Sequence, residues 1–245
     1  MTASVASLRT MNSGSGLEGR HVVVTGSAGG LGPAVVDALL AAGAICHLPL
    51  RGGGDGARQD AVKDARIVSV AGVDLTDEAV VSAYYASRPP LWASVHLAGG
   101  FRGAPLLDTT LADLETQIEQ NLISAFLCCR EAARNMRAAG GGGRIANVSS
   151  RAAAVPAGGA VAYTVAKAGV SALTQALADE LRGDGILVNA VVPSIIDTPA
   201  NRAAMPAADH ARWPKPAEIA AVLAWLISPG NVLTSGALVP VYGRA

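Results

Sequence analysis

Three side chains near the middle of the chain have types and spacing that suit acid–base chemistry on a carbonyl group. Tyr163 and Lys167 stand four residues apart, so they share one face of a helix, and Ser150 precedes them at the end of an apolar run. A free phenol has a pKa of about 10, which a nearby ammonium lowers. Such a phenol can protonate an alkoxide or deprotonate an alcohol, while a serine hydroxyl hydrogen-bonds the reacting oxygen. A tyrosine and a lysine at this spacing often lie only on the solvent-exposed face of a helix. Whether this pair is catalytic therefore depends on the rest of the chain.

The elements around these residues are predicted from local pattern. Residues 143–150 are apolar and β-branched enough for a buried strand that ends in hydroxyl groups. Residues 160–182 carry apolar side chains at helical spacing, and Gly183 is a suitable end for that helix. A strand, a loop and a helix therefore bring the three side chains to one pocket.

A glycine-rich turn near the start of the chain predicts a phosphate-binding loop. Residues 20–25 form a short β-branched strand, a turn with Gly26, Gly30 and Gly32 follows, and residues 33–44 form an apolar-periodic helix that stops at Gly43. Glycines let backbone N–H groups approach a pyrophosphate, and the start of a helix supplies partial positive charge. This context favours a dinucleotide.

The end of the second strand favours NADP over NAD. An acidic residue near this point would hold the ribose hydroxyls of NAD, but Leu50 and Arg51 stand there, before a glycine-rich turn at residues 52–56. A guanidinium pairs well with a 2′-phosphate. The alternative is that Arg51 is a solvated loop residue.

The remaining chain alternates strands and helices. Such alternation predicts βαβ units in a doubly wound Rossmann fold, with a central parallel sheet of about seven strands covered by helices on both faces. No linker or internal repeat interrupts it, so residues 17–245 are predicted to form one domain, after a flexible leader at residues 1–16. The other expected strands are 44–50, 66–75, 91–101, 143–150, 185–194 and 236–243, and the other expected helices are 76–87, 111–140, 160–182 and 216–228.

Composition limits which kinds of partner and which cellular compartment we expect for this chain. The chain is 51% hydrophobic with a net charge of zero, which gives no indication of a nucleic-acid partner. No apolar run is long enough for a membrane span. Cys46, Cys128 and Cys129 have no C-x-x-C spacing, so we expect small buried residues in a reducing cytoplasm and no metal site.

From about Leu17 onward, the chain resembles the short-chain dehydrogenase/reductase family in several motifs that occur in the family's order. The resemblance identifies Ser150 rather than Ser149 as the catalytic serine, because Ser150 lies thirteen residues before Tyr163. The matching residues are Thr25, Gly26, Gly30 and Gly32 for T-G-x-x-x-G-x-G, Asp74 for the acid near the adenine, Asn121, Ser150, Tyr163 and Lys167 for the catalytic tetrad, and Pro193, Ser194 and Thr198 for P-G-x-x-x-T.

The resemblance implies a mechanism in which NADPH delivers hydride to a carbonyl carbon. Ser150 would polarise the carbonyl oxygen and Tyr163 would donate the proton. Lys167 would lower the pKa of Tyr163 and bind the nicotinamide ribose, and Asn121 would hold a water that links Lys167 to solvent. The implied cofactor-binding residues are Thr25, Gly26, Gly30, Leu31, Gly32, Arg51, Asp74, Leu75, Ala98, Gly99, Tyr163, Lys167, Pro193, Ile196 and Thr198, of which Thr198 and the Ile196 backbone would hold the carboxamide.

Three departures from the family pattern stand out. His96 and Leu97 replace the usual pair of asparagines after the fourth strand, and we expect His96 to be a structural residue with its hydrogen bonds satisfied. Ser194 replaces a glycine beside the expected nicotinamide site, and Gly29 stands where NADP enzymes of the family often have a basic residue.

The segment at residues 199–216 corresponds to the family's substrate lid. It is short and rich in alanine and proline, which favours a small or extended substrate such as a 3-oxoacyl thioester. Met205 and Trp213 are candidates for an apolar wall, and Arg202 or His210 for contact with a polar substrate group.

Three alternatives stay open from the sequence. The run Ala98–Phe101 resembles pteridine reductases, which offers a second substrate class. A non-catalytic dinucleotide-binding scaffold is possible on the same fold, although a scaffold has no need of the tetrad. Relatives commonly pair the helices at 111–139 and 160–182 between subunits, so a homo-oligomer is expected, either a tetramer or a dimer.

Overall fold

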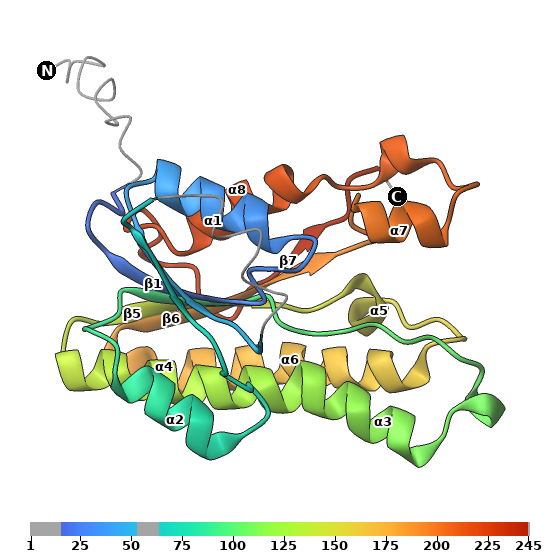
Figure 1. The fold of residues 1–245 in the computed structure, drawn as a ribbon, viewed down its shortest axis with the longest axis horizontal. Coiled ribbons are helices and arrows are strands. Elements are labelled where there is room, and N and C mark those ends of the chain that lie inside the picture. Colours follow the sequence, from blue (N-terminus) through green and yellow to red (C-terminus); the bar gives the residue numbers. More distant parts are fainter. Residues whose placement is uncertain (1–15, 53–63, 245) are drawn as a thin grey trace, which may run out of the picture.

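The molecule is built around one parallel sheet. A computed structural model describes residues 16–52 and 64–244, so the expected leader and most of the turn after Arg51 lie outside the described residues. Seven strands lie in the order β3-β2-β1-β4-β5-β6-β7, and every neighbouring pair is parallel (Figure 1). The strands are β1 (His21–Thr25), β2 (Ile45–Pro49), β3 (Ile67–Val70), β4 (Ala93–His96), β5 (Gly143–Val148), β6 (Ile186–Pro193) and β7 (Leu238–Val241).

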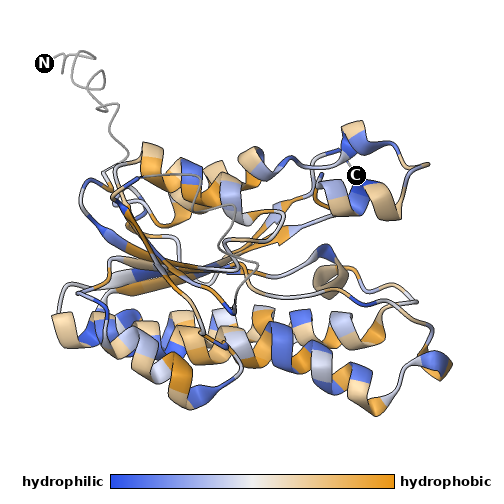
Figure 2. Ribbon diagram, in the orientation of Figure 1, coloured by the Kyte–Doolittle hydropathy of each residue, from blue (hydrophilic) through white to orange (hydrophobic). Residues whose placement is uncertain are grey.

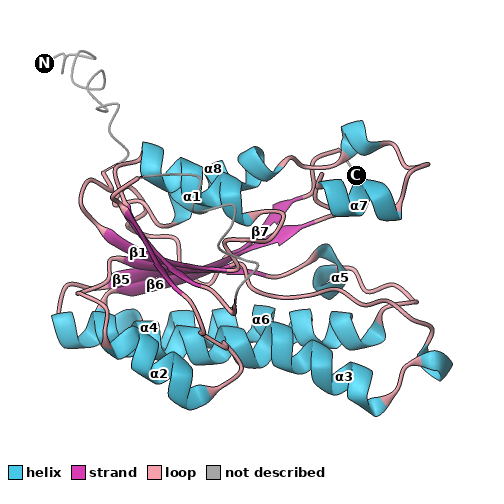
Figure 3. Ribbon diagram, viewed as in Figure 1, coloured by secondary structure: helices cyan, strands magenta, loops and turns pink. Residues whose placement is uncertain are grey.

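Helices cover both faces of this sheet. Helices α1 and α8 pack together on one face, and α2, α4 and α6 lie on the other, with α3 beside α6 (Figures 1 and 3). The doubly wound Rossmann architecture expected from the alternation of elements is therefore confirmed. The helices are α1 (Gly32–Ala41), α2 (Glu78–Ala86), α3 (Leu111–Ile118), α4 (Ser124–Ala139), α5 (Arg151–Ala154), α6 (Val161–Glu180), α7 (Pro199–Ala204) and α8 (Pro216–Leu226), with short 3-10 turns at Leu106–Asp108, Arg182–Asp184 and His210–Arg212 and a π-helical turn, η3, at Glu119–Ile123.

The core has two parts because successive strand residues point to opposite faces. In β1, Val22 and Val24 pack with Leu39 and Leu223 under α1 and α8, whereas Val23 packs on the other face. The strands are mostly hydrophobic, whereas the helices carry both hydrophilic and hydrophobic residues (Figure 2). All three cysteines are free and buried, as expected.

Several element boundaries differ from the sequence prediction. Strand β3 ends at Val70, so Asp74 lies in the following loop rather than at the strand end. Helix α2 begins at Glu78 instead of residue 76, because Asp77 caps it and its carboxylate accepts hydrogen bonds from two backbone amides. Helix α6 ends at Glu180 instead of Gly183, because a 3-10 turn follows and Gly185 takes the left-handed conformation.

Candidate active site

Strand β5 and helix α6 position the hydroxyl-bearing residues of the candidate site. Ser149 is buried, donating to the carbonyl of Lys167 at 3.0 Å and pairing with Ser171 at 2.7 Å. Ser150 caps α5 and accepts from the amide of Ala152 at 3.2 Å. Both serines face α6, but the Ser149 hydroxyl is bonded to the Lys167 carbonyl and Ser171, which leaves Ser150 as the serine that meets Tyr163.

Tyr163 lies in the first turn of α6 and meets Ser150. A hydrogen bond joins the two side chains and lowers the pKa of Tyr163, but burial has the larger effect and raises it. The ring of Phe101 meets the Tyr163 ring edge to face, with 5.0 Å between centroids. Phe101 itself is 70% exposed, so it forms an open wall beside the phenol.

Lys167 lies one helical turn beyond Tyr163, on the same face of α6. Its Nζ donates to the carbonyl of Val148 at 2.9 Å and lies 5.9 Å from the centre of the Tyr163 ring. Burial lowers the pKa of Lys167 to about 8. The expectation that Lys167 lowers the pKa of Tyr163 is not met here: in the structure the net shift of the Tyr163 pKa is upward, because burial outweighs the favourable contacts.

Asn121 approaches Lys167 from the π-helical turn η3. A Cβ placed on Gly99 would lie 2.5 Å from Asn121 Oδ1 and 3.4 Å from Lys167 Nζ, so both side chains converge on this glycine. Asn121 Nδ2 donates to the carbonyls of Gly100 and Gln117, each at 3.0 Å. The second of these bonds reaches a carbonyl four residues earlier, in the last turn of α3. Sequence alone placed Asn121 in a regular helix and did not reveal this turn.

A cavity of about 420 Å³ at the carboxyl ends of the strands reaches Gly99, on which Asn121 and Lys167 converge, although none of the four catalytic candidates lines it. Gly26 has a φ of +66°, and a Cβ there would lie 2.6 Å from the amide nitrogen of Ala98, so only glycine permits β1 and β4 to approach so closely. Ala28, Gly29 and Gly30 are exposed in the turn ahead of α1, whereas Leu31 is buried. The cavity is lined by Gly26, Ser27, Ala28, Gly29, Pro49, Leu50, Arg51, Val73, Leu75, Thr76, Leu97, Ala98, Gly99, Gln120 and Ser124.

The predicted adenosine-side residues surround one end of this cavity. Arg51 is exposed and lines it, and no described carboxylate forms an ion pair with Arg51. Leu75 also lines the cavity, but the carboxylate of Asp74 accepts two hydrogen bonds from Thr76, at 2.9 and 2.8 Å. These bonds hold the pKa of Asp74 below its usual range, and the charge of Arg51 adds a smaller effect. The residues present fit a dinucleotide.

The lid segment closes against the glycine turn. Strand β6 ends at Pro193, and Thr198 then caps α7 and packs its methyl group on Gly30, where a Cβ would lie 2.7 Å away. The Ile196 carbonyl accepts hydrogen bonds from the amide of Thr198 and the side chain of Asn201, each at 2.8 Å. Thr198 therefore lies against the glycine turn and Ile196 is hydrogen-bonded beside it, while their expected contact with the carboxamide stays a prediction.

The comparisons with known proteins agree with this arrangement. A family model described as short chain dehydrogenase matches residues 20–209. The chain belongs to the short-chain dehydrogenase/reductase family. It is therefore an oxidoreductase, and its relatives include dehydrogenases that act on alcohols.

Similar members of this family span nearly the whole chain. The cis-4-hydroxycyclohexanecarboxylate dehydrogenase of Sinomonas cyclohexanicum is 36% identical, over 91% of this chain and 95% of that protein. The galactitol 2-dehydrogenase of Rhizobium johnstonii is 34% identical, over 92% of this chain and 94% of its own length. A solved oxidoreductase of the same family from Burkholderia thailandensis is 30% identical and covers 92% of each chain with a TM-score of 0.84.

Within this short-chain dehydrogenase/reductase, His96 is a structural residue, as expected. Its Nδ1 lies 2.8 Å from Asn147 Oδ1 and its Nε2 lies 2.8 Å from Ser94 Oγ. Burial lowers the pKa of His96 to about 4, so the ring is neutral near pH 7. The pair of asparagines usual in the family is replaced by a buried polar network inside the sheet.

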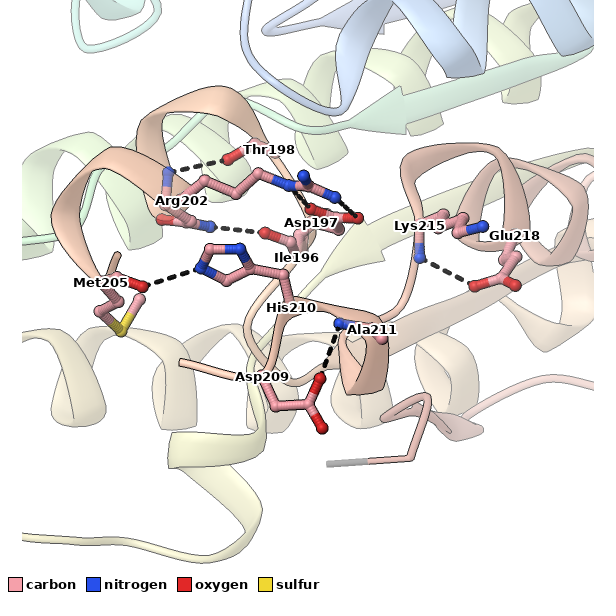
Figure 4. A network of polar contacts seen from close by, with 11 residues as sticks. Ile196, Asp197, Thr198, Arg202, Met205, Asp209, His210, Ala211, Lys215 and Glu218 are labelled. Carbon is pink, nitrogen blue, oxygen red and sulfur yellow. Dashed lines mark hydrogen bonds and ion pairs between the residues drawn. The ribbon is translucent and has the colours of Figure 1, made fainter. Parts of the chain in front are cut away.

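The lid residues singled out from sequence are held mainly within the lid. Arg202 points toward Asp197 and pairs with its carboxylate at 2.8 Å, and His210 lies 2.8 Å from the carbonyl of Met205 (Figure 4). Trp213 is buried and contacts the ring of His210, with centroids 4.6 Å apart. The side chains of Arg202 and His210 therefore already have polar partners within this part of the chain.

Sequence reasoning missed two residues at this edge of the sheet. Phe101 reaches the Tyr163 ring, and its signal is an aromatic residue directly after the glycine pair at Gly99 and Gly100. Arg151 directly follows Ser150, and an arginine at that place is visible in the sequence. Among the described residues, no group of histidine, cysteine and acidic side chains suits a metal ion, and no helix is long and apolar enough to cross a membrane.

Proposed function

We propose that this protein interconverts a secondary alcohol and a ketone with a nicotinamide dinucleotide, and that Asn121, Ser150, Tyr163 and Lys167 form its catalytic group. The observation that carries this proposal is that Asn121 and Lys167 converge on Gly99, which lines the cavity, while Tyr163 lies one helical turn from Lys167 and meets Ser150. The relatives' alcohol substrates support a small hydroxylated compound, such as a ring alcohol or a polyol, over a 3-oxoacyl thioester.

The proposed roles follow from the contacts of the side chains. Ser150 positions the substrate oxygen, and Tyr163 donates a proton to that oxygen in reduction or accepts it in oxidation. The bound nucleotide supplies the hydride or takes it up. Because burial raises the pKa of Tyr163, the phenol is protonated near pH 7, which suits proton donation. Oxidation requires the phenolate, so its rate is expected to rise with pH.

The decisive variant is Tyr163→Phe. It removes the hydroxyl but keeps the ring against Phe101, so we expect at least about a hundredfold loss of kcat, as for a general acid–base group. Nucleotide affinity should change little, and fluorescence titration with NADPH and NADH measures it. Ser149→Ala is the matched control, because the Ser149 hydroxyl is bonded to the Lys167 backbone carbonyl and to Ser171 instead of Tyr163. Retained turnover in Tyr163→Phe would contradict the proposed role, and nucleotide binding without turnover by the wild type would favour the scaffold alternative.

We also propose that the preferred nucleotide is NADP(H), with Arg51 on its 2′-phosphate. The support is that Arg51 lines the cavity without an ion-pair partner among the described residues, and that Leu50 stands where an acid would favour NAD. In wild type, NADPH should bind more tightly than NADH. Arg51→Ala should weaken NADPH about tenfold to a hundredfold and leave NADH nearly unchanged, because a charge-assisted hydrogen bond is lost from only one of them. A wild-type preference for NADH would refute this assignment.

A further inference from the structure

Arg151 is a half-buried cation beside the proposed catalytic serine. It is the first residue of α5, directly after Ser150. Its guanidinium carbon lies 5.2 Å from the centre of the Tyr242 ring. Within residues 16–52 and 64–244, no carboxylate forms an ion pair with Arg151. Arg151 is thus a partly exposed cation to which the described chain supplies no anion.

Two other arginines near the site differ from Arg151 in having carboxylate partners. Arg102 pairs with Asp113 at 2.7 Å, and Arg202 pairs with Asp197 at 2.8 Å. Each of these guanidinium groups is neutralised by its own carboxylate. Arg151 has only an aromatic ring against it.

The position of Tyr242 places Arg151 on the substrate side of the sheet. Tyr242 follows the carboxyl end of β7, and its carbonyl accepts a hydrogen bond from Ser194 at 2.8 Å. Ser194 follows the carboxyl end of β6 and begins the connection to the lid helix α7. Arg151 therefore lies between Ser150 and the root of the lid, at the edge where ligands bind in open α/β sheets.

A guanidinium stacked on a ring keeps its binding capacity. The ring attracts the cation through its face, while the N–H donors point outward in the guanidinium plane. A carboxylate can accept two of these donors at once, which is a stronger and more directional contact than a neutral hydrogen bond. Tyr242 would then hold the Arg151 guanidinium in place and leave its N–H donors available for a ligand.

We infer that Arg151 binds a carboxylate of the substrate, so that the preferred substrates are hydroxy acids and oxo acids whose carboxylate is on a carbon other than the reacting one. This inference rests on the proposed function, since Ser150 and Tyr163 must hold the reacting oxygen. The other interpretation is that Arg151 only packs against Tyr242.

Binding of two matched probes tests the inference without turnover. Cyclohexanecarboxylate and cyclohexanecarboxamide have nearly the same shape, differ in charge and lack a hydroxyl group to oxidise. Calorimetric titration into the protein saturated with nicotinamide dinucleotide should show the carboxylate binding about tenfold to a hundredfold more tightly. In Arg151→Gln the two affinities should become nearly equal, and Arg151→Lys should keep part of the preference because it keeps the charge without the planar fork.

Controls separate this result from a loss of structure or of overall charge. Arg182→Gln removes an exposed arginine at the other edge of the sheet and should leave the preference unchanged. Thermal unfolding and nucleotide titration establish that Arg151→Gln is folded. Equal affinities in wild type, no measurable binding of the carboxylate, or an unchanged preference in a folded Arg151→Gln protein would each overturn the inference.

Turnover of a neutral alcohol tests the proposed function separately from the assignment of Arg151. Nucleotide-dependent oxidation of cyclohexanol tests the proposed function alone, because this alcohol offers Arg151 no anion. If cyclohexanol is oxidised but the probes bind equally, only the assignment of Arg151 fails. If neither cyclohexanol nor a hydroxycyclohexanecarboxylate is oxidised with either nucleotide, the proposed function fails, and the inference fails with it.

Discussion

Lys167 carries a charge that the fold makes costly. The residue is 5% exposed, its Nζ donates to the Val148 carbonyl, and burial lowers its pKa from 10.5 to about 8. A fixed ammonium beside Tyr163 is useful for binding and for proton transfer, so the site accepts an energetic cost for it. That cost has a measurable dependence on pH.

The free energy of unfolding should rise with pH in the range where only the unfolded chain keeps this proton. Below pH 8 the lysine is charged in both states. Between about pH 8 and 10.5 the folded protein releases the proton first, so the unfolded state binds more protons and stability increases. The gain is at most about 3 kcal/mol, at 1.36 kcal/mol for each unit of pKa difference.

Urea unfolding of wild type and Lys167→Met from pH 7.5 to 10.5 measures this effect. The wild type should gain stability relative to Lys167→Met across the range, whereas Lys215→Met, which changes an exposed lysine, should follow the wild type. Parallel curves for wild type and Lys167→Met would show that the burial of Lys167 does not shift its pKa.

At the same scale, residue types and spacing predicted which side chains gather but not their contacts. The spacing of Tyr163 and Lys167 was enough to place both on one face of α6. The direction of the Tyr163 pKa was predicted wrongly, because burial depends on the surrounding elements and not on a neighbour in the sequence. Phe101 was missed for the same reason, since its contact with Tyr163 joins segments far apart in the chain.

At the scale of elements, hydrophobic periodicity predicted all seven strands and the long helices. The predicted ends of elements were wrong where side chains form hydrogen bonds to the backbone groups at those ends. Asp74 bonds Thr76 and thereby leaves Asp77 to cap α2, a choice that propensity alone does not determine. Short helices such as α5 and α7 were not predicted, because one or two turns carry too little periodicity to detect.

At the scale of the whole molecule, several apolar side chains of the described residues are exposed on neighbouring helices. They include Phe126 on α4 and Val161 and Val165 on α6, and these two helices lie side by side on one face of the sheet. Exposed apolar clusters of this kind favour association between proteins. We therefore expect two copies of the chain to associate through α4 and α6, in a dimer or a tetramer.

Light scattering coupled to size exclusion tests this expectation. The double substitution Phe126→Glu and Val165→Glu places charge on both helices, so the assembly should dissociate to a smaller species, because buried unpaired carboxylates are costly. Ala71→Glu, in an exposed loop at the β3 edge, should leave the molecular mass unchanged. A monomeric wild type at micromolar concentration would contradict the expectation.

The π-helical turn η3 holds one residue more than an α-turn over the same span. Deleting one residue between Glu119 and Ile123 would therefore close η3 into an ordinary α-turn and leave α3 and α4 in nearly their present relation. What the deletion would change is the local position of Asn121, which this turn presents to Gly99 and Lys167. The extra residue thus matters more to the direction of one side chain than to the packing of the two helices.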